Sequence, residues 1–150
     1  MKLKRALSVV CLGVLMSVML TGCLTNKPVP LPDGMDEKAV ETAGEEVVEL
    51  LLAEKYEEVA AMFREDIRTQ PGKEITGDVV KELVESQILP EESGIFVKLI
   101  DTYAEGVNGA AEPQGVAVIH AEYTKDKVGY GVAFDLDMNL TGLSIATDMM

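Results

Sequence analysis

The sequence is poor in the residues that most often build disulfides, metal sites and catalytic centres. Its two cysteines, Cys11 and Cys23, both lie in the first 23 residues, so the rest of the chain holds neither a disulfide framework nor a cysteine metal cluster. His120 is the only histidine, which argues against a histidine-based metal site. Nucleophile motifs, glycine-rich phosphate loops and the ligand spacing of an EF-hand are missing as well. We therefore expect no metal and no cofactor.

Basic residues are also scarce. The 150 residues include 13 basic and 26 acidic side chains, a formal net charge of −13. Removal of residues 1–22, which hold three of the basic side chains, would leave 10 basic and 26 acidic groups and a net charge of −16. Because so acidic a body repels nucleic acid, we expect no nucleic-acid partner. The length allows one domain of ordinary size and no second domain.

The first 23 residues follow the pattern of an export signal. Met1–Arg5 is cationic, and the apolar run over residues 6–20 is shorter than the membrane span of about 20 residues. The run ends in Leu20-Thr21-Gly22-Cys23, which resembles the lipobox of bacterial lipoproteins. The resemblance implies a signal peptide over residues 1–22 and a diacylglyceryl group on Cys23, the first residue after cleavage. The alternatives are an ordinary secretory signal with a coincidental cysteine and an uncleaved anchor helix.

A lipid on Cys23 would attach the protein to the cell membrane, with the rest of the chain on the extracytoplasmic face. Each buried methylene contributes about 0.8 kcal/mol, and two or more acyl chains make the attachment persistent where one does not. After Cys23, Pro28, Pro30 and Pro32 alternate with other residues, a pattern that favours extended, polyproline-like chain. We interpret residues 23–35 as the lipidated cysteine and a tether, and residues 36–150 as the folded domain that the tether holds clear of the membrane.

The folded part of the sequence predicts helices followed by strands. Apolar residues recur at helical steps over residues 40–51, after Asp36 as the N-terminal cap, and again over residues 59–63. A third helix is predicted from Thr76, as its cap, to a point before Pro90. Beyond it the apolar period drops to two, which predicts strands over residues 95–103, 115–123, 128–136 and 140–147. This order is typical of the α+β class, with N-terminal helices packed on an antiparallel sheet of about four strands.

Two segments of the domain resemble a bacterial secreted-domain family. The first is Val47–Phe63, which contains Tyr56-Glu57-Glu58-Val59, and the second runs from Tyr123 through the Phe134-Asp135 pair to Leu140-Thr141-Gly142-Leu143. The family is similar to a domain of unknown function (family 3887-like) of the nuclear transport factor 2-like, or cystatin-like, superfamily. The resemblance covers residues 36–147 and implies a cone in which a curved sheet wraps the long first helix. It brings no catalytic residues with it.

The predicted hairpin register decides which side chains face the helices. A loop around Lys125-Asp126 that pairs Tyr123 with Val128 divides the strand residues between two faces of the sheet. The face toward the helices is predicted to hold Ala117, Ile119, Ala121, Tyr123, Val128, Tyr130, Val132, Phe134, Leu136, Leu143 and Ile145. Tyr123, Tyr130 and Phe134 are the candidate pocket residues, because an apolar cone with tyrosine hydroxyls suits a small apolar ligand. The alternative, that these side chains simply fill the core, stays open.

The opposite face of the sheet is predicted to be nearly flat. Its small residues are Gly129, Gly131, Ala133, Gly142, Ser144 and Ala146. Glycine weakens strands, so this concentration suggests that another surface approaches closely. We predict that a homodimer or an envelope-protein partner docks here, with a bare solvated sheet as the alternative. His120 and Asp135 are predicted on the same face, opposite Gly131 and Val116.

Two functions follow from this sequence. The first is a non-catalytic binding or scaffolding module in the cell envelope. The alternative is a pocket enzyme with hydrolase- or isomerase-like acid/base chemistry, which would need His120 or an aspartate to face the interior of the cone. A lone histidine in a strand is more often packed or solvated than catalytic, so we favour the binding module and predict no catalytic residue.

Overall fold

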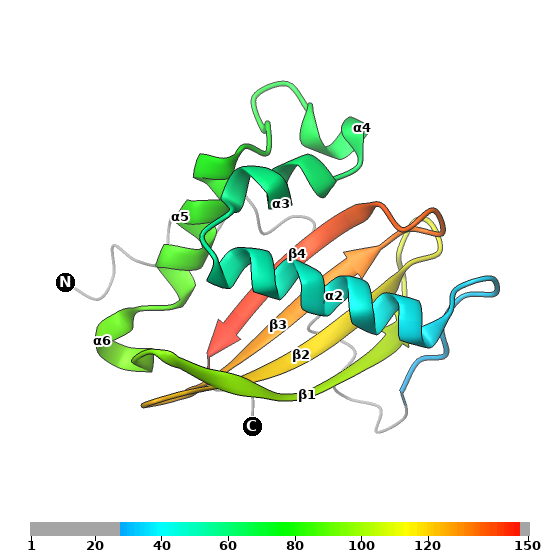
Figure 1. Ribbon diagram of the computed structural model, residues 1–150. Helices are drawn as coiled ribbons and strands as arrows, with labels where there is room; N and C mark the ends of the chain where they lie inside the picture. Colours follow the sequence, from blue (N-terminus) through cyan, green and yellow to red (C-terminus); the bar gives the residue numbers. More distant parts are fainter. Residues whose placement is uncertain (1–27, 148–150) are drawn as a thin grey trace.

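The computed structural model describes residues 28–147, so the predicted signal peptide and Cys23 lie outside the described residues. The described chain forms helices followed by a four-stranded antiparallel sheet in the order β1-β2-β3-β4, open at both edges (Figure 1). The predicted α+β class is confirmed. No helix within residues 28–147 has both the length and the apolar character needed to cross a membrane.

The helices begin at the predicted caps but are divided differently. In α2 (Glu37–Leu52) the Asp36 carboxylate accepts a hydrogen bond from the Ala39 amide at 2.8 Å. In α5 (Gly77–Gln87) the Thr76 hydroxyl accepts one from the Val79 amide at 3.4 Å. Three short helices complete the helical part of residues 28–147: α3 (Tyr56–Met62), α4 (Glu65–Arg68) and α6 (Pro90–Ser93).

The break between α3 and α4 comes from a contact with the sheet. Phe63 and Arg64 adopt extended backbone, with ψ of 139° and 137°. Phe63 forms a parallel bridge to Leu140, and the Arg64 amide donates to the Leu140 carbonyl at 2.9 Å. The helix ends here because Phe63 and Arg64 bond to Leu140 at the start of β4. The apolar pattern of residues 59–63 did not predict this break.

The strands are β1 (Phe96–Gly106), β2 (Gly115–Tyr123), β3 (Lys127–Phe134) and β4 (Leu140–Thr147). The bounds of β2 and β4 are those predicted from the period-two pattern. β1 continues to Gly106 instead of ending at Tyr103, and β3 ends at Phe134 instead of Leu136.

The β2–β3 hairpin is tighter than predicted, and the predicted register is wrong. The Tyr123 amide donates to the Asp126 carbonyl at 2.9 Å, so only Thr124 and Lys125 form the turn. Both turn residues are held by the end of α6 and the residue before β1, because the Lys125 amide donates to the Ser93 carbonyl and the Thr124 amide to the Ile95 carbonyl. Val128 therefore pairs with Ala121 rather than with Tyr123. The shift is two residues long, so every side chain keeps its predicted face.

The helix-facing side of the sheet forms the core, as predicted. Its members Ala117, Ile119, Ala121, Tyr123, Val128, Tyr130, Val132, Phe134, Leu143 and Ile145 are all at most 8% exposed. They pack against α2, which lies across the sheet (Figure 1) and contributes Val40, Val47, Val48 and Leu51. Leu136 was expected in this set and is instead 48% exposed, because β3 ends before it.

The described part of the predicted tether, residues 28–35, lies against the domain. The Gly106 amide at the end of β1 donates to the Val29 carbonyl at 2.8 Å. Leu31 and Met35 pack against the core, close to Gly115 at the start of β2. The ordered contacts of the domain therefore begin before Asp36.

Candidate functional site

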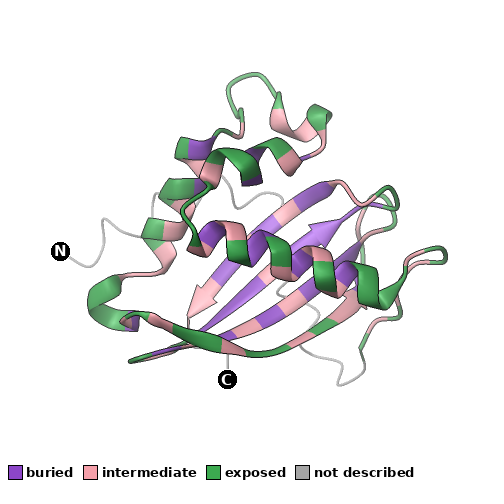
Figure 2. Cartoon of the chain, viewed as in Figure 1, coloured by how far each residue is buried: buried purple, intermediate pink, exposed green. Residues whose placement is uncertain are grey.

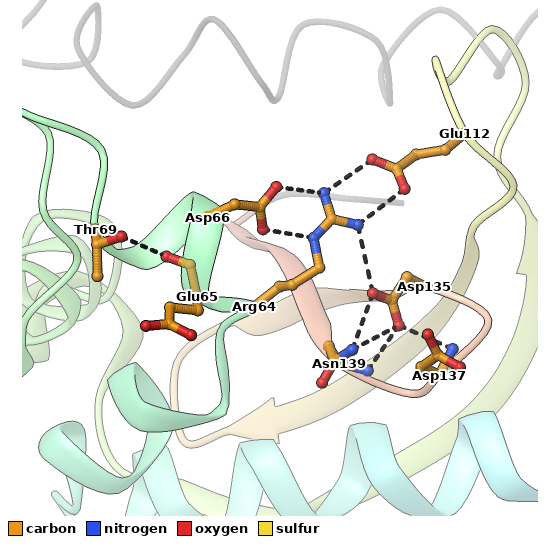
Figure 3. Close-up of polar contacts among 8 residues, drawn as sticks. All are labelled: Arg64, Glu65, Asp66, Thr69, Glu112, Asp135, Asp137 and Asn139. Atoms are coloured by element: carbon orange, nitrogen blue, oxygen red, sulfur yellow. Dashed lines mark hydrogen bonds and ion pairs between the residues drawn. The ribbon is translucent and has the colours of Figure 1, made fainter.

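Arg64 is the centre of a cluster of polar side chains from separate parts of the described chain (Figure 3). Its guanidinium donates to both carboxylate oxygens of Asp66, at 2.6 and 3.0 Å, and to both of Glu112, at 2.8 and 2.9 Å. A further bond, 3.4 Å long, joins its Nη1 to Asp135. These partners come from α4, from the β1–β2 loop and from the turn after β3. Arg64 thus joins the helical layer to the β1–β2 loop and the β3–β4 turn, which lie at the same end of the sheet.

Asp135 organises the turn between β3 and β4. Its Oδ1 accepts hydrogen bonds from the backbone amides of Asp137, at 3.0 Å, and Asn139, at 2.9 Å, and the Asn139 side-chain amide also bonds to it. Met138 adopts a positive φ of 63°, which the turn requires. The prediction that Asp135 lies opposite Val116 is wrong, because Val116 pairs with Ala133 and Asp135 comes after the strand ends.

The charges of this cluster are fixed by their partners. Hydrogen bonds that the guanidinium donates to Glu112 and Asp66 raise the pKa of Arg64, and the hydrogen bond from Arg64 lowers the pKa of Asp66. Burial alone would raise the pKa of Asp135, but the hydrogen bonds from Asn139, Arg64 and Asp137 outweigh it and hold this pKa below its ordinary range. Asp135 is therefore ionised at neutral pH and poorly suited to act as a general acid.

A pocket of about 260 Å³ lies beside the cluster, and its walls include Arg64, Glu112, Pro113, Asp135, Asp137 and Asn139. The Arg64 guanidinium already bonds to three carboxylates, so it has little capacity left for an anionic ligand. Within residues 28–147, no group of three or more metal-ligating side chains stands close enough to hold an ion. No pattern in the sequence predicts the pairing between Arg64 and Glu112, because the two residues lie 48 positions apart. We interpret the cluster as a set of ion pairs that holds the β1–β2 loop and the β3–β4 turn in place.

The candidate pocket residues lie inside the core. Tyr130 and Phe134 are 1% and 0% exposed, and Tyr123 is 8% exposed. The hydroxyls of Tyr123 and Tyr130 bond to each other at 2.7 Å, and the Phe96 ring meets the edge of the Tyr123 ring. Burial raises the pKa of both tyrosines. These side chains pack as core residues, which corresponds to the alternative left open by the sequence.

The candidate interface residues lie on the far face of the sheet, but they differ in burial. Gly129 and Ala133 are buried, whereas Gly131, Gly142, Ser144 and Ala146 are partly exposed. A side chain at Gly131 would collide with the hydroxyl of Ser144, its partner in β4. That hydroxyl donates a long hydrogen bond, 3.4 Å, to the Gly131 carbonyl. The glycine at position 131 thus makes room for a residue of the same chain.

His120 also lies on this far face, where it is paired with Gly129 rather than with Gly131 as predicted. Its Nδ1 is 2.6 Å from an Asp101 carboxylate oxygen on β1. The side chain of Asp101 is 58% exposed, so the pair stands at the surface and not inside the fold.

The comparisons with known proteins give a family and a fold. The model of the family described as "Protein of unknown function (DUF3887)" matches residues 44–143. Among solved structures, "NMR structure of protein from Ruminococcus gnavus ATCC 29149" is similar, with a TM-score of 0.61 and 23% identity, over 78% of this chain and 96% of that chain. At this identity the likeness shows a shared fold alone. Comparison with curated proteins finds no match.

Proposed function

Because the chain belongs to the DUF3887 family of proteins of unknown function, its role has to follow from its own residues, and we propose that it is a membrane-anchored extracytoplasmic lipoprotein whose single domain is a non-catalytic binding or scaffolding module. The anchor in this proposal is a lipid on Cys23, supported by the lipobox-like Leu20-Thr21-Gly22-Cys23 after a cationic and apolar leader. The open, helix-covered antiparallel sheet is consistent with the nuclear transport factor 2-like superfamily.

One observation supports binding over catalysis. The helix-facing side of the sheet, where chemistry in a cone would take place, is occupied by packed side chains. Tyr130 and Phe134 are essentially unexposed, and the two tyrosine hydroxyls satisfy each other. A small apolar ligand would have to displace these side chains, so the surfaces that remain open to a partner are the outer ones.

The enzyme alternative needs an ionisable acid or base toward the interior. Among the described residues, His120 lies on the far face beside Asp101, and Asp135 is engaged by Arg64 and Asn139. No observation favours the alternative over the binding module.

Mass spectrometry of the protein purified from the membranes of a bacterial host tests the anchor. We expect a mature chain that starts at Cys23 and carries the mass of a lipid. The Cys23→Ala variant should accumulate at precursor length and leave the membrane fraction on salt washing. An unmodified Cys23 in the wild type, or a Cys23→Ala variant that stays processed and membrane-bound, would overturn the assignment.

The predicted interface on the far face is tested by the mass of the assembled particle. Light scattering of the detergent-solubilised wild type is expected to give a dimer if a second copy docks there, and Ala146→Gln should return it to a monomer. A wild-type monomer would exclude the homodimer and leave an envelope protein as the partner for this face.

A further inference from the structure

β1 and the residue before it carry most of the large exposed apolar side chains of the described chain. Ile95, Val97 and Ile100 are 72%, 50% and 46% exposed, and they lie in or next to this strand. Figure 2 shows β1 mostly in the colours of exposed and intermediate residues, in contrast to β2 and β3. Large apolar side chains gathered on one strand are typical of an interaction surface, whereas isolated ones need no explanation.

Among residues 28–147, no strand pairs with the outer side of β1. The strand order places β1 at one edge of the sheet, with β2 as its neighbour. At its end, the Gly106 amide points away from β2 to the Val29 carbonyl, and the next amide, of Val107, points back to Gln114, the residue before β2. Because the direction alternates along a strand, the amides of Thr102 and Ala104 share the outward direction of Gly106. No described strand pairs with them.

This edge already accepts an extended segment at one position. Val29 sits between Pro28 and Pro30, and its carbonyl receives the Gly106 amide at 2.8 Å. The contact is a single backbone hydrogen bond at the last residue of β1. The part of the β1 edge before Gly106 has further backbone donors and acceptors that point in the same direction.

Two irregularities limit where a partner strand can pair. The β1–β2 register shifts between Phe96 and Lys98 and again between Leu99 and Asp101. Bulges of this kind protect edge strands from unwanted pairing. From Asp101 to Gly106 the ladder is regular, so pairing is confined to this stretch, and the exposed Val97 and Ile100 remain available for side-chain contacts.

Charge decides between a second copy and a different partner. Along the open stretch the charged side chains are those of Glu105 and of Asp101, which contacts His120 on β2, whereas Glu122 lies opposite Lys98 outside this stretch and forms an ion pair with it. The whole chain has a net charge of −13, so two copies repel each other, while a basic segment is attracted.

We infer that the open edge of β1 binds an extended segment of another protein with alternating basic and apolar residues, which pairs with Asp101–Glu105 as an added strand. The inference rests on the proposed binding function and specifies its surface and partner. It does not depend on the lipid at Cys23.

The test uses the full chain in nanodiscs of zwitterionic lipid and a fluorescein-labelled, capped octapeptide of alternating Val and Lys. Fluorescence anisotropy measures its binding, with the matching Val and Glu octapeptide as the charge control. We expect the Lys peptide to bind and Ala104→Pro to weaken it at least tenfold, since proline removes an outward amide without removing a bond to β2.

A second pair of variants keeps the test independent of how well Ala104→Pro folds. Ile100→Lys should weaken binding at least tenfold, whereas Leu136→Lys should leave it unchanged, because the two positions have similar exposure and gain the same charge. If Ile100→Lys and Leu136→Lys weaken binding equally, or if the Lys peptide binds Ala104→Pro as well as wild type, the binding is due to general electrostatic attraction and the inference is overturned.

The remaining outcomes also decide the question. Absence of binding by the Lys peptide overturns the edge site but leaves the lipid anchor and the other outer face untouched, since these have their own experiments. Concentration-dependent dimers that Ala104→Pro abolishes would assign the edge to a second copy and overturn the basic partner.

Discussion

At the scale of single residues, the polar groups that look most reactive are bound to other parts of the same chain. Arg64 bonds to three carboxylates, and Asp135 accepts hydrogen bonds from two backbone amides of its own turn. A buried carboxylate with several donors stabilises the fold because its removal leaves those donors without partners. The first two predictions test this reasoning on Asp135 and on the tyrosine pair.

Replacement of Asp135 by alanine should lower the free energy of unfolding by about 2–3 kcal/mol, the cost of leaving buried donors unpaired. Urea denaturation followed by circular dichroism measures it. Asp137→Ala is the matched control, because Asp137 is exposed and belongs to the same turn, and it should change the stability by less than about 0.5 kcal/mol. Equal losses in the two variants would contradict the role of Asp135.

The paired hydroxyls of Tyr123 and Tyr130 should show strong coupling. Tyr123→Phe leaves the Tyr130 hydroxyl buried without its partner and should cost about 1–3 kcal/mol, whereas the double phenylalanine variant should be close to wild type. A double-mutant cycle from urea midpoints measures the coupling. Additive losses would show that the hydroxyl pair is not the source of the stability.

The same pair predicts a loss of stability in alkali. Both pKa values are raised in the folded state, so above pH of about 10 the unfolded chain loses protons that the folded chain keeps. Stability is therefore complete below that pH and falls as the pH rises through the folded pKa values. Between pH 9 and pH 11, the free energy of unfolding should fall less in the double phenylalanine variant than in the wild type. The difference between the two losses should be about 1 kcal/mol or more.

At the scale of elements, the sequence predicted the features that depend on neighbouring residues. The caps Asp36 and Thr76 and the period-two strands were predicted from the sequence because neighbouring residues determine them. The break at Phe63 was not, since a bridge to Leu140 at the other end of the chain produces it. The hairpin register was wrong by two residues because contacts with Ser93 and Ile95 tighten the turn.

The candidate site could be predicted in part for the same reason. The alternation of apolar and polar residues predicted on which face of the sheet each strand residue lies. The burial of Tyr130 and the surface position of His120 agree with that prediction. The cluster around Arg64 joins residues from separate segments, and no pattern in one sequence pairs them. The exposed Val97 and Ile100 result from bulges, which interrupt the alternation on which such predictions depend.

The contact between α2 and the sheet gives a prediction at this scale. A methyl group on Gly44 would collide with the methyl of Ala117 and reach 3.1 Å from Ile119 Cδ1. Gly44→Ala should therefore cost about 1–3 kcal/mol in overpacking, although alanine favours the helix by about 1 kcal/mol. Ala117→Gly in the same chain should recover stability by removing the colliding methyl. A double variant less stable than the sum of the single variants would contradict the close approach.

At the scale of the whole molecule, the excess of negative charge opposes compactness. The net charge of −13 is spread over the helices as well as the loops, and Glu46 and Glu49 on the exposed side of α2 have no ion-pair partner among the described residues. Acidic groups brought together by folding repel each other, and salt screens this repulsion. The Arg64 cluster works in the opposite direction, because salt weakens its ion pairs.

The stability of the protein should therefore rise with salt. From about 10 mM to 150 mM NaCl the Debye length falls from about 30 Å to about 8 Å, so the long-range repulsion is screened more than the contacts within hydrogen-bond distance. A gain of about 1 kcal/mol would raise the thermal midpoint by about 4 °C in scanning calorimetry. The variant with Glu46→Gln and Glu49→Gln should be more stable than wild type in low salt and respond less to added salt. A midpoint that falls with salt would mean that attractive pairs such as those of Arg64 outweigh the repulsion, and the acidic surface would then not limit the stability of the fold.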